Sequence, residues 1–141
     1  AAKDEVEAAK WFRKAAEQGD AKAQYGLGLV LAHGNGVAKN EDEAAKWWRK
    51  AAEQGDTFAQ YGLGRMLAKG QSVAKDEVEA VKWFRKAAEQ GGARAQLRLG
   101  EMLANGQGVA KDRAEAAKWF RKAAEQGNVE AQDSLHKLGV F

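Results

Sequence analysis

A unit of 36 residues recurs along this chain of 141 residues, and this repetition constrains the fold more than any other feature. Tryptophans mark the period at Trp11, Trp47, Trp83 and Trp119, and a glycine follows each of them eight residues later. Such a period is typical of solenoids, in which each unit contacts only its neighbours. The sequence therefore predicts a stack of similar units instead of a single globular core.

Each unit contains two helical patterns, and the chain has no proline to interrupt them. We call them the first-type and the second-type helix, by their order within a complete helix pair. The second-type helix begins at an Asx residue with Glu three residues later, which resembles a capping box, and ends before a glycine. We expect this cap at Asp4 and in each later copy. A first-type helix follows at once, beginning at Asp20, Asp56, Gly92 or Asn128. The expected elements are a lone second-type helix at 4–18, complete helix pairs at 20–54, 56–90 and 92–126, and a C-terminal capping helix at 128–138.

No helix pair can bury its own apolar stripe, so neighbouring units must stack. The predicted fold is an all-α, right-handed α-α superhelix of eight helices. Gly28, Gly64 and Gly100 recur inside the first-type helices, where each costs about 1 kcal/mol relative to alanine. That cost indicates a close helix crossing at this position. His136 occupies the same position in the last copy, as suits a terminal capping helix.

We expect the invariant tryptophans to be buried in the core.

The repeated motif resembles the Sel-1-like repeat family, a relative of the tetratricopeptide repeat. The matching segments are Ala23-Gln24-Tyr25-Gly26-Leu27-Gly28, Gly34 to Val37 and Ala44 to Gly55, and they recur one period later. The chain departs from the family where many members have proline after the turn, because Ala38, Ala74 and Ala110 stand there. The resemblance implies an adaptor or scaffold protein that binds partners on its concave surface, of a family frequent in bacteria and often exported.

A binding face is expected where the copies differ, because residues that serve stacking should be the same at every junction. Four variable positions of the first-type helix, 22, 26, 29 and 33, lie on one helix face. In related solenoids this face lines the concave side. It would form a basic groove with Phe58 as an apolar anchor; the alternative is a merely solvated surface. The predicted partner-binding residues are Lys22, Tyr25, Leu29, His33, Phe58, Tyr61, Arg65, Lys69, Arg94, Arg98, Glu101 and Asn105.

The expected partner is a protein or peptide, with an extended or acidic segment as ligand. A net charge of +3 is too small to indicate nucleic acid, and no apolar run approaches the length of a membrane span. The chain has no cysteine, and its two histidines, His33 and His136, lie three copies apart. We therefore expect no metal and no cofactor.

An enzyme is the opposing interpretation. Ser134-Leu-His-Lys137 matches the S-x-x-K nucleophile motif, and cysteine-rich relatives of this family have been linked to β-lactamase-like or penicillin-binding activity. The match lacks its partner motifs and lies on the terminal helix. We expect a chain that is not an enzyme; a third interpretation is a purely structural or designed repeat array.

The first helix carries apolar residues that a terminal helix normally lacks, namely Val6, Trp11 and Phe12. An open apolar strip is therefore expected at this end. It would be covered by repeats upstream or by self-association of two chains, with Val140-Phe141 contributing.

Overall fold

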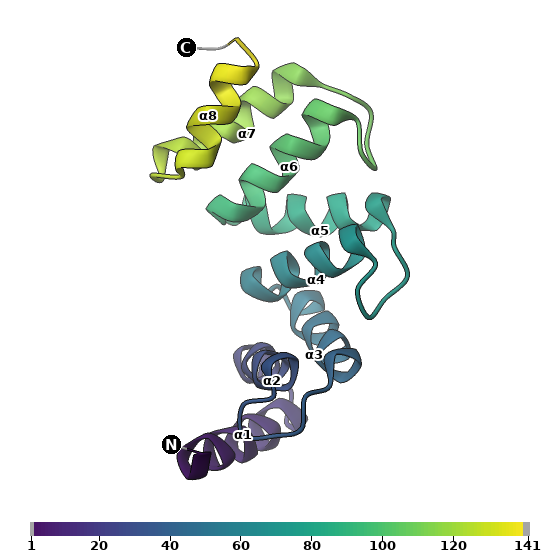
Figure 1. Ribbon diagram of the computed structural model, residues 1–141, viewed down its shortest axis with the longest axis vertical. Helices are drawn as coiled ribbons and strands as arrows, with labels where there is room; N and C mark the ends of the chain where they lie inside the picture. The colour runs from purple at the N-terminus through teal and green to yellow at the C-terminus, as the bar shows by residue number, and fades with distance from the viewer. Residues whose placement is uncertain (1, 140–141) are drawn as a thin grey trace.

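The computed structural model describes residues 2–139, which form eight α-helices and no strand. The helices follow one another along a single axis in chain order, with the two ends of the chain at opposite ends of the array (Figure 1). This arrangement confirms the predicted all-α solenoid. The elements are α1 (Ala2–Glu17), α2 (Ala21–His33), α3 (Glu41–Glu53), α4 (Thr57–Lys69), α5 (Glu77–Glu89), α6 (Ala93–Asn105), α7 (Arg113–Glu125) and α8 (Val129–Lys137).

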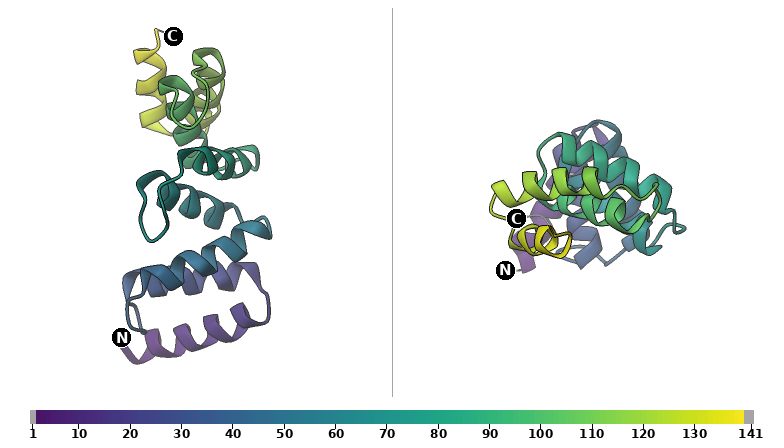
Figure 2. Two further views of the ribbon diagram at one scale, coloured as in Figure 1. Left: turned by 90° about the vertical axis from the view of Figure 1, so that its right-hand side faces the viewer. Right: turned by 90° about the horizontal axis from the view of Figure 1, so that it is seen from above.

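Capping residues mark the ends of the helices. The side chains of Asn40, Asp76 and Asp112 each accept a hydrogen bond, of 2.9 to 3.0 Å, from the backbone N–H three residues on. First-type helices α2, α4 and α6 end at glycines in the left-handed conformation, which residues with a side chain rarely adopt. The two helices of each pair are joined by an extended loop, residues 34–40 between α2 and α3, and lie side by side (Figure 2).

The predicted cap at Asp4 is wrong, because α1 begins at Ala2 and Asp4 lies in its first turn. In later copies the capping residue is held by the preceding first-type helix; the Asp76 N–H donates to the Leu67 carbonyl at 2.9 Å. No helix precedes α1 in the described chain to supply such a carbonyl. The backbone before Glu5 is therefore not turned into the extended cap conformation, and the helix continues through it.

Glycine allows each first-type helix to contact an aromatic ring of the next second-type helix. A Cβ placed on Gly64 would lie 2.8 Å from Cε1 of Phe84, and one placed on Gly100 would lie 2.5 Å from Cε1 of Phe120. Gly28 faces the Trp48 indole in the same way. Phe84 and Phe120 are almost completely buried. The close crossing predicted from the glycines is confirmed.

The expectation that the repeated tryptophans form the core is wrong. Trp47, Trp83 and Trp119 are half-buried, and Trp11 is 65% exposed. The Trp47 indole N–H donates to Glu43 Oε2 at 3.1 Å, and Lys50 Nζ lies 4.8 Å from its ring centroid. Trp47, Trp83 and Trp119 each bond a glutamate of their own helix, and this glutamate also pairs with an arginine of the preceding repeat. In α5 and α7 the residue after the tryptophan, Phe84 or Phe120, supplies the ring that fills the core.

An arginine–glutamate ladder links successive second-type helices. Arg49 Nη1 lies 2.8 Å from Glu79 Oε2, and the same oxygen accepts the Trp83 indole N–H at 3.1 Å. Arg13 with Glu43 and Arg85 with Glu115 repeat this contact at 3.0 and 2.7 Å. Each rung therefore joins two repeats.

A glutamine ladder runs parallel to it inside the array. Gln60 is 3% exposed; its Nε2 donates to the Ala52 carbonyl at 3.2 Å, and its Oε1 accepts from Gln90 Nε2 at 2.9 Å. Gln24 and Gln96 make the same pair of bonds in their own repeats. All of these buried amides are satisfied, so the ladder specifies the register of the stack.

The arginine–glutamate ladder makes stability depend on pH. The hydrogen bond from Arg49 lowers the pKa of Glu79 despite partial burial, and Arg13 and Arg85 lower the pKa of Glu43 and Glu115 likewise. A carboxyl whose pKa is depressed by folding stabilises the protein above its unfolded pKa. This contribution is lost as pH falls through the lower, folded-state pKa. We expect the free energy of unfolding in urea to fall as pH drops below the ordinary glutamate value of 4.5.

Neutralising the three ladder carboxylates together should flatten this fall. The variant is Glu43→Gln/Glu79→Gln/Glu115→Gln. Its matched control, Glu17→Gln/Glu53→Gln/Glu89→Gln, changes three exposed carboxylates at the helix ends by the same charge. An equally flat profile in both variants would contradict the role of the ladder.

Candidate binding groove

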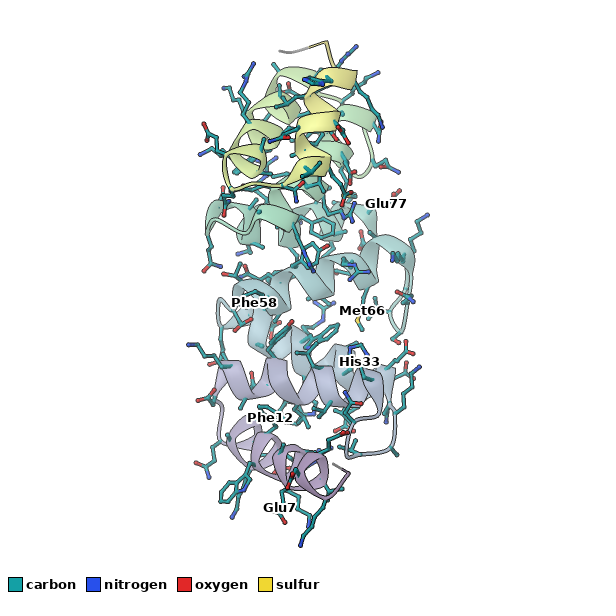
Figure 3. The ribbon with its side chains drawn as sticks, turned by 60° about the vertical axis from the view of Figure 1, so that its left-hand side comes forward. Glu7, Phe12, His33, Phe58, Met66 and Glu77 are labelled. Carbon is teal, nitrogen blue, oxygen red and sulfur yellow. The ribbon has the colours of Figure 1, made fainter. Side chains whose placement is uncertain are left out.

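A hollow of about 720 Å³ opens between α2, α3, α4 and the start of α6. Phe58, Met66 and His33, which lie along its wall, are seen near the middle of the array (Figure 3). We call this hollow the aromatic groove. It is lined by Tyr25, Leu29, His33, Trp48, Thr57, Phe58, Tyr61, Gly62, Arg65, Met66, Gln71, Gly92, Ala93, Arg94 and Ala95.

Three aromatic rings from three different helices stack in the groove. The Tyr25 ring lies 5.7 Å from Phe58 and 6.0 Å from Trp48 between centroids, with interplanar angles of 30° and 25°. The Trp48 indole N–H donates to the Tyr25 carbonyl at 3.1 Å, which fixes the position of the indole. Phe58 remains 68% exposed although it is stacked. The result is a rigid apolar surface that is open to solvent.

The Tyr25 hydroxyl is a hydrogen-bond donor at neutral pH. Burial raises the pKa of its phenol, Asp56 adds to the rise, and Arg94 opposes it. A phenol is protonated at neutral pH in any case, and the net rise leaves it so. The groove therefore offers a polar group beside its rings, as binding sites for amphipathic ligands commonly do.

Arg65 and Arg94 carry the positive charge of the groove. The Arg65 guanidinium lies 5.8 Å from the centroid of the Tyr61 ring, and no aspartate or glutamate lines the groove. Arg98 is different, because its Nη1 lies 2.9 Å from Glu101 Oε1. Burial acts to lower the pKa of Arg98, but interactions with Glu101 and Tyr61 outweigh it and leave the pKa raised. Its charge is thus compensated within α6.

The structure brings seven of the twelve sequence-predicted residues together around the groove. They are Tyr25, Leu29, His33, Phe58, Tyr61, Arg65 and Arg94. The remaining five, which do not line it, are Lys22, Lys69, Arg98, Glu101 and Asn105. Sequence reasoning missed Trp48 and Met66, which lie on constantly apolar positions. The signal for Trp48 was present, because this copy alone has two adjacent tryptophans.

One premise of the sequence argument is wrong at position 26 and its counterparts. These residues vary between copies and were expected to take no part in packing. A Cβ on Gly26 would lie 2.6 Å from Cε1 of Phe12, and one on Gly62 would lie 3.1 Å from Cε3 of Trp48. In these two copies glycine therefore leaves space for a ring. The third copy has Arg98 instead, which is half-buried.

The Ser134 hydroxyl donates to the Glu130 carbonyl of its own helix at 2.9 Å. No cluster of three or more histidine or acidic side chains within residues 2–139 is placed to hold a metal ion. Among the described helices none is both long enough and apolar enough to cross a membrane.

The Sel1 repeat model matches residues 1–20, 21–56, 57–92 and 93–128. A Sel1 repeat protein from Oxalobacter formigenes is 44% identical with a TM-score of 0.84, over 89% of this chain and 95% of that one. The cysteine-rich protein B of Helicobacter pylori is 27% identical with a TM-score of 0.74, over 96% and 97% of the two chains.

The protective antigen c5321 of uropathogenic Escherichia coli is 45% identical with a TM-score of 0.85. The match covers 90% of this chain but only 27% of that longer protein. No curated protein sequence matches the chain significantly.

Proposed function

Because the chain belongs to the Sel1 repeat family, whose members are generally protein-interaction modules, we propose that it is a binding adaptor whose partner docks in the aromatic groove. The observation that carries this proposal is the stack of the half-buried Tyr25 and Trp48 with the exposed Phe58. Two arginines lie beside it, and the residues that line the groove include no aspartate or glutamate. Exposed aromatic and arginine side chains in a preformed hollow are typical anchors of protein interfaces.

The ligand we propose is an extended segment that combines hydrophobic and acidic residues. An apolar side chain would pack on Phe58, and carboxylates would pair with Arg65 and Arg94, for which a guanidinium offers bidentate geometry. Lysine or arginine in the ligand would be repelled. Since the rings are already ordered by their mutual contacts, binding would cost little conformational entropy in the groove.

Two peptide sets of equal length, one acidic and hydrophobic, the other basic and hydrophobic, test this proposal by isothermal titration calorimetry. We expect the acidic set to bind more tightly and to weaken with salt, because salt screens partly exposed charges. Arg65→Glu/Arg94→Glu should weaken binding by about tenfold or more, and Phe58→Ala by a similar factor.

The matched control is Lys118→Glu/Arg121→Glu, which makes the same change in net charge on two exposed residues of α7. This variant should bind like the parent chain. Preference for basic peptides, or equal losses in both double variants, would contradict docking in the aromatic groove. Binding that persists in all variants would place the partner elsewhere on the array.

We also propose that the chain is not an enzyme. Two observations support this: the Ser134 hydroxyl donates to the Glu130 carbonyl of its own helix, and the S-x-x-K match lacks its partner motifs. Nitrocefin hydrolysis, with Ser134→Ala as the control, tests the opposing β-lactamase-like activity. Turnover that the substitution abolishes would overturn the proposal.

A further inference from the structure

The outer face of α1 is uncovered, although the same face of every later second-type helix is covered. Ala8 is exposed, whereas its counterparts Ala44, Ala80 and Ala116 have no exposed surface. Phe12 is half-buried, while the equivalent phenylalanines of α5 and α7 are almost completely buried. Glu7 and Phe12 both lie in α1, the helix at the N-terminal end of the array (Figure 3).

Two polar side chains at this end lack the partners that their counterparts have. Glu7 corresponds to Glu43, whose carboxylate pairs with an arginine 30 residues earlier. Gln18 corresponds to Gln54, whose Nε2 donates at 2.9 Å to a buried glutamine 30 residues earlier. Within residues 2–139 neither Glu7 nor the Gln18 amide has such a partner. This end therefore has both the apolar surface and the polar groups of a stacking junction.

The C-terminal end has the complementary polar groups but a different crossing residue. Arg121 corresponds to the arginines of the arginine–glutamate ladder and Gln132 to the buried glutamines of the other ladder, and both are exposed. His136, however, occupies the position of Gly100. Even a Cβ at Gly100 would lie 2.5 Å from a ring atom of Phe120. The larger side chain of His136 would therefore clash with a phenylalanine that a following repeat placed at the equivalent position.

We propose that the array stacks in one direction only: α1 accepts a further helix pair of this repeat class joined ahead of it, and His136 closes the other end. The fitting occupant offers glycine opposite Phe12, arginine to Glu7 and glutamine to Gln18. A second copy of this chain does not fit. Its crossing glycines are already covered by rings of α3, α5 and α7, and α8 carries His136. Val140-Phe141, expected to aid self-association, lie outside the described residues.

The chain itself supplies a probe for the N-terminal end. Residues 73–108, placed directly before Ala1, continue the 36-residue period in register. Hydrogen exchange of the α1 amides is the measurement. We expect exchange to slow by about tenfold or more, because stacking suppresses fraying of a terminal helix. The added residues that would meet Phe12, Glu7 and Gln18 are the copies of Gly100, Arg85 and Gln96.

A matched probe carries Gly100→Val in the added copy only, so that length and helix content are kept. It should leave α1 exchange as fast as in the parent chain. Equal protection of α1 by both probes, or no protection by the glycine probe although its own helices exchange slowly, would overturn the proposal.

The C-terminal end is tested by adding residues 34–69 after Phe141, which again continues the period. We expect α8 exchange to be unchanged by this addition and to slow by about tenfold when His136→Gly is combined with it. Slowing without the substitution would show that His136 does not close the array. For the unmodified chain, sedimentation should show a monomer; a dimer that Phe12→Glu dissociates would identify a second copy as the occupant and overturn the proposal.

Discussion

Replacing Gly100 with valine is expected to lower the free energy of unfolding by about 3 kcal/mol, at the upper end of typical overpacking effects. The new Cβ would lie 2.5 Å from Cε1 and 2.7 Å from Cδ1 of Phe120. The ring is almost completely buried, so it cannot move away without disturbing α7 and the contacts around it. Urea unfolding followed by circular dichroism measures the change.

Arg65→Ala is the control for this experiment, because Arg65 is exposed on the groove side of α4. Its loss should change the free energy of unfolding by less than about 0.5 kcal/mol. If both variants were equally destabilised, the assignment of packed and open helix faces would be wrong.

Gln60→Leu is expected to destabilise the protein by about 2 kcal/mol, although leucine is more hydrophobic and similar in size. The substitution removes the buried hydrogen bond to the Ala52 carbonyl and the part-buried hydrogen bond from the amide of Gln90, which is itself exposed. The cost is that of losing two hydrogen bonds between repeats, one of them buried, and we expect it to outweigh the gain from burying a larger apolar surface.

The same substitution at the last position of this column provides a matched control. Gln132 is exposed, and no described repeat follows it to complete a rung. Gln132→Leu should therefore change the free energy of unfolding by less than about 0.5 kcal/mol. A comparable loss at both positions would attribute the effect to helix propensity and not to the glutamine ladder.

The 36-residue period was sufficient to predict the fold, because stacking imposes the same contacts on every copy. Gly28, Gly64 and Gly100 revealed the helix crossing, since a glycine inside a helix needs a steric reason. Differences between copies at positions 29 and 65 led to the groove, where Leu29 and Arg65 both lie.

Invariance alone could not separate burial from an edge contact. Trp47, Trp83 and Trp119 are half-buried, and each bonds a glutamate at a junction. The sequence does not show which side of the helix faces solvent. Glutamine was equally ambiguous: Gln60 and Gln132 share one motif position, but only the first is buried. The Asp4 cap failed because capping here depends on a carbonyl from a neighbouring helix.

The half-buried tryptophans can serve as intrinsic fluorescence probes of the junctions between repeats. In α3, α5 and α7 the indole N–H is bonded to a glutamate that an arginine of the preceding repeat also holds, so separation of two repeats changes the surroundings of one ring. A lysine ammonium lies near the face of each of these rings. The emission wavelength of an indole depends on such polar surroundings. Local opening differs from one junction to the next. With the other tryptophans changed to phenylalanine, the emission wavelength of the remaining tryptophan would report the opening of its own junction alone.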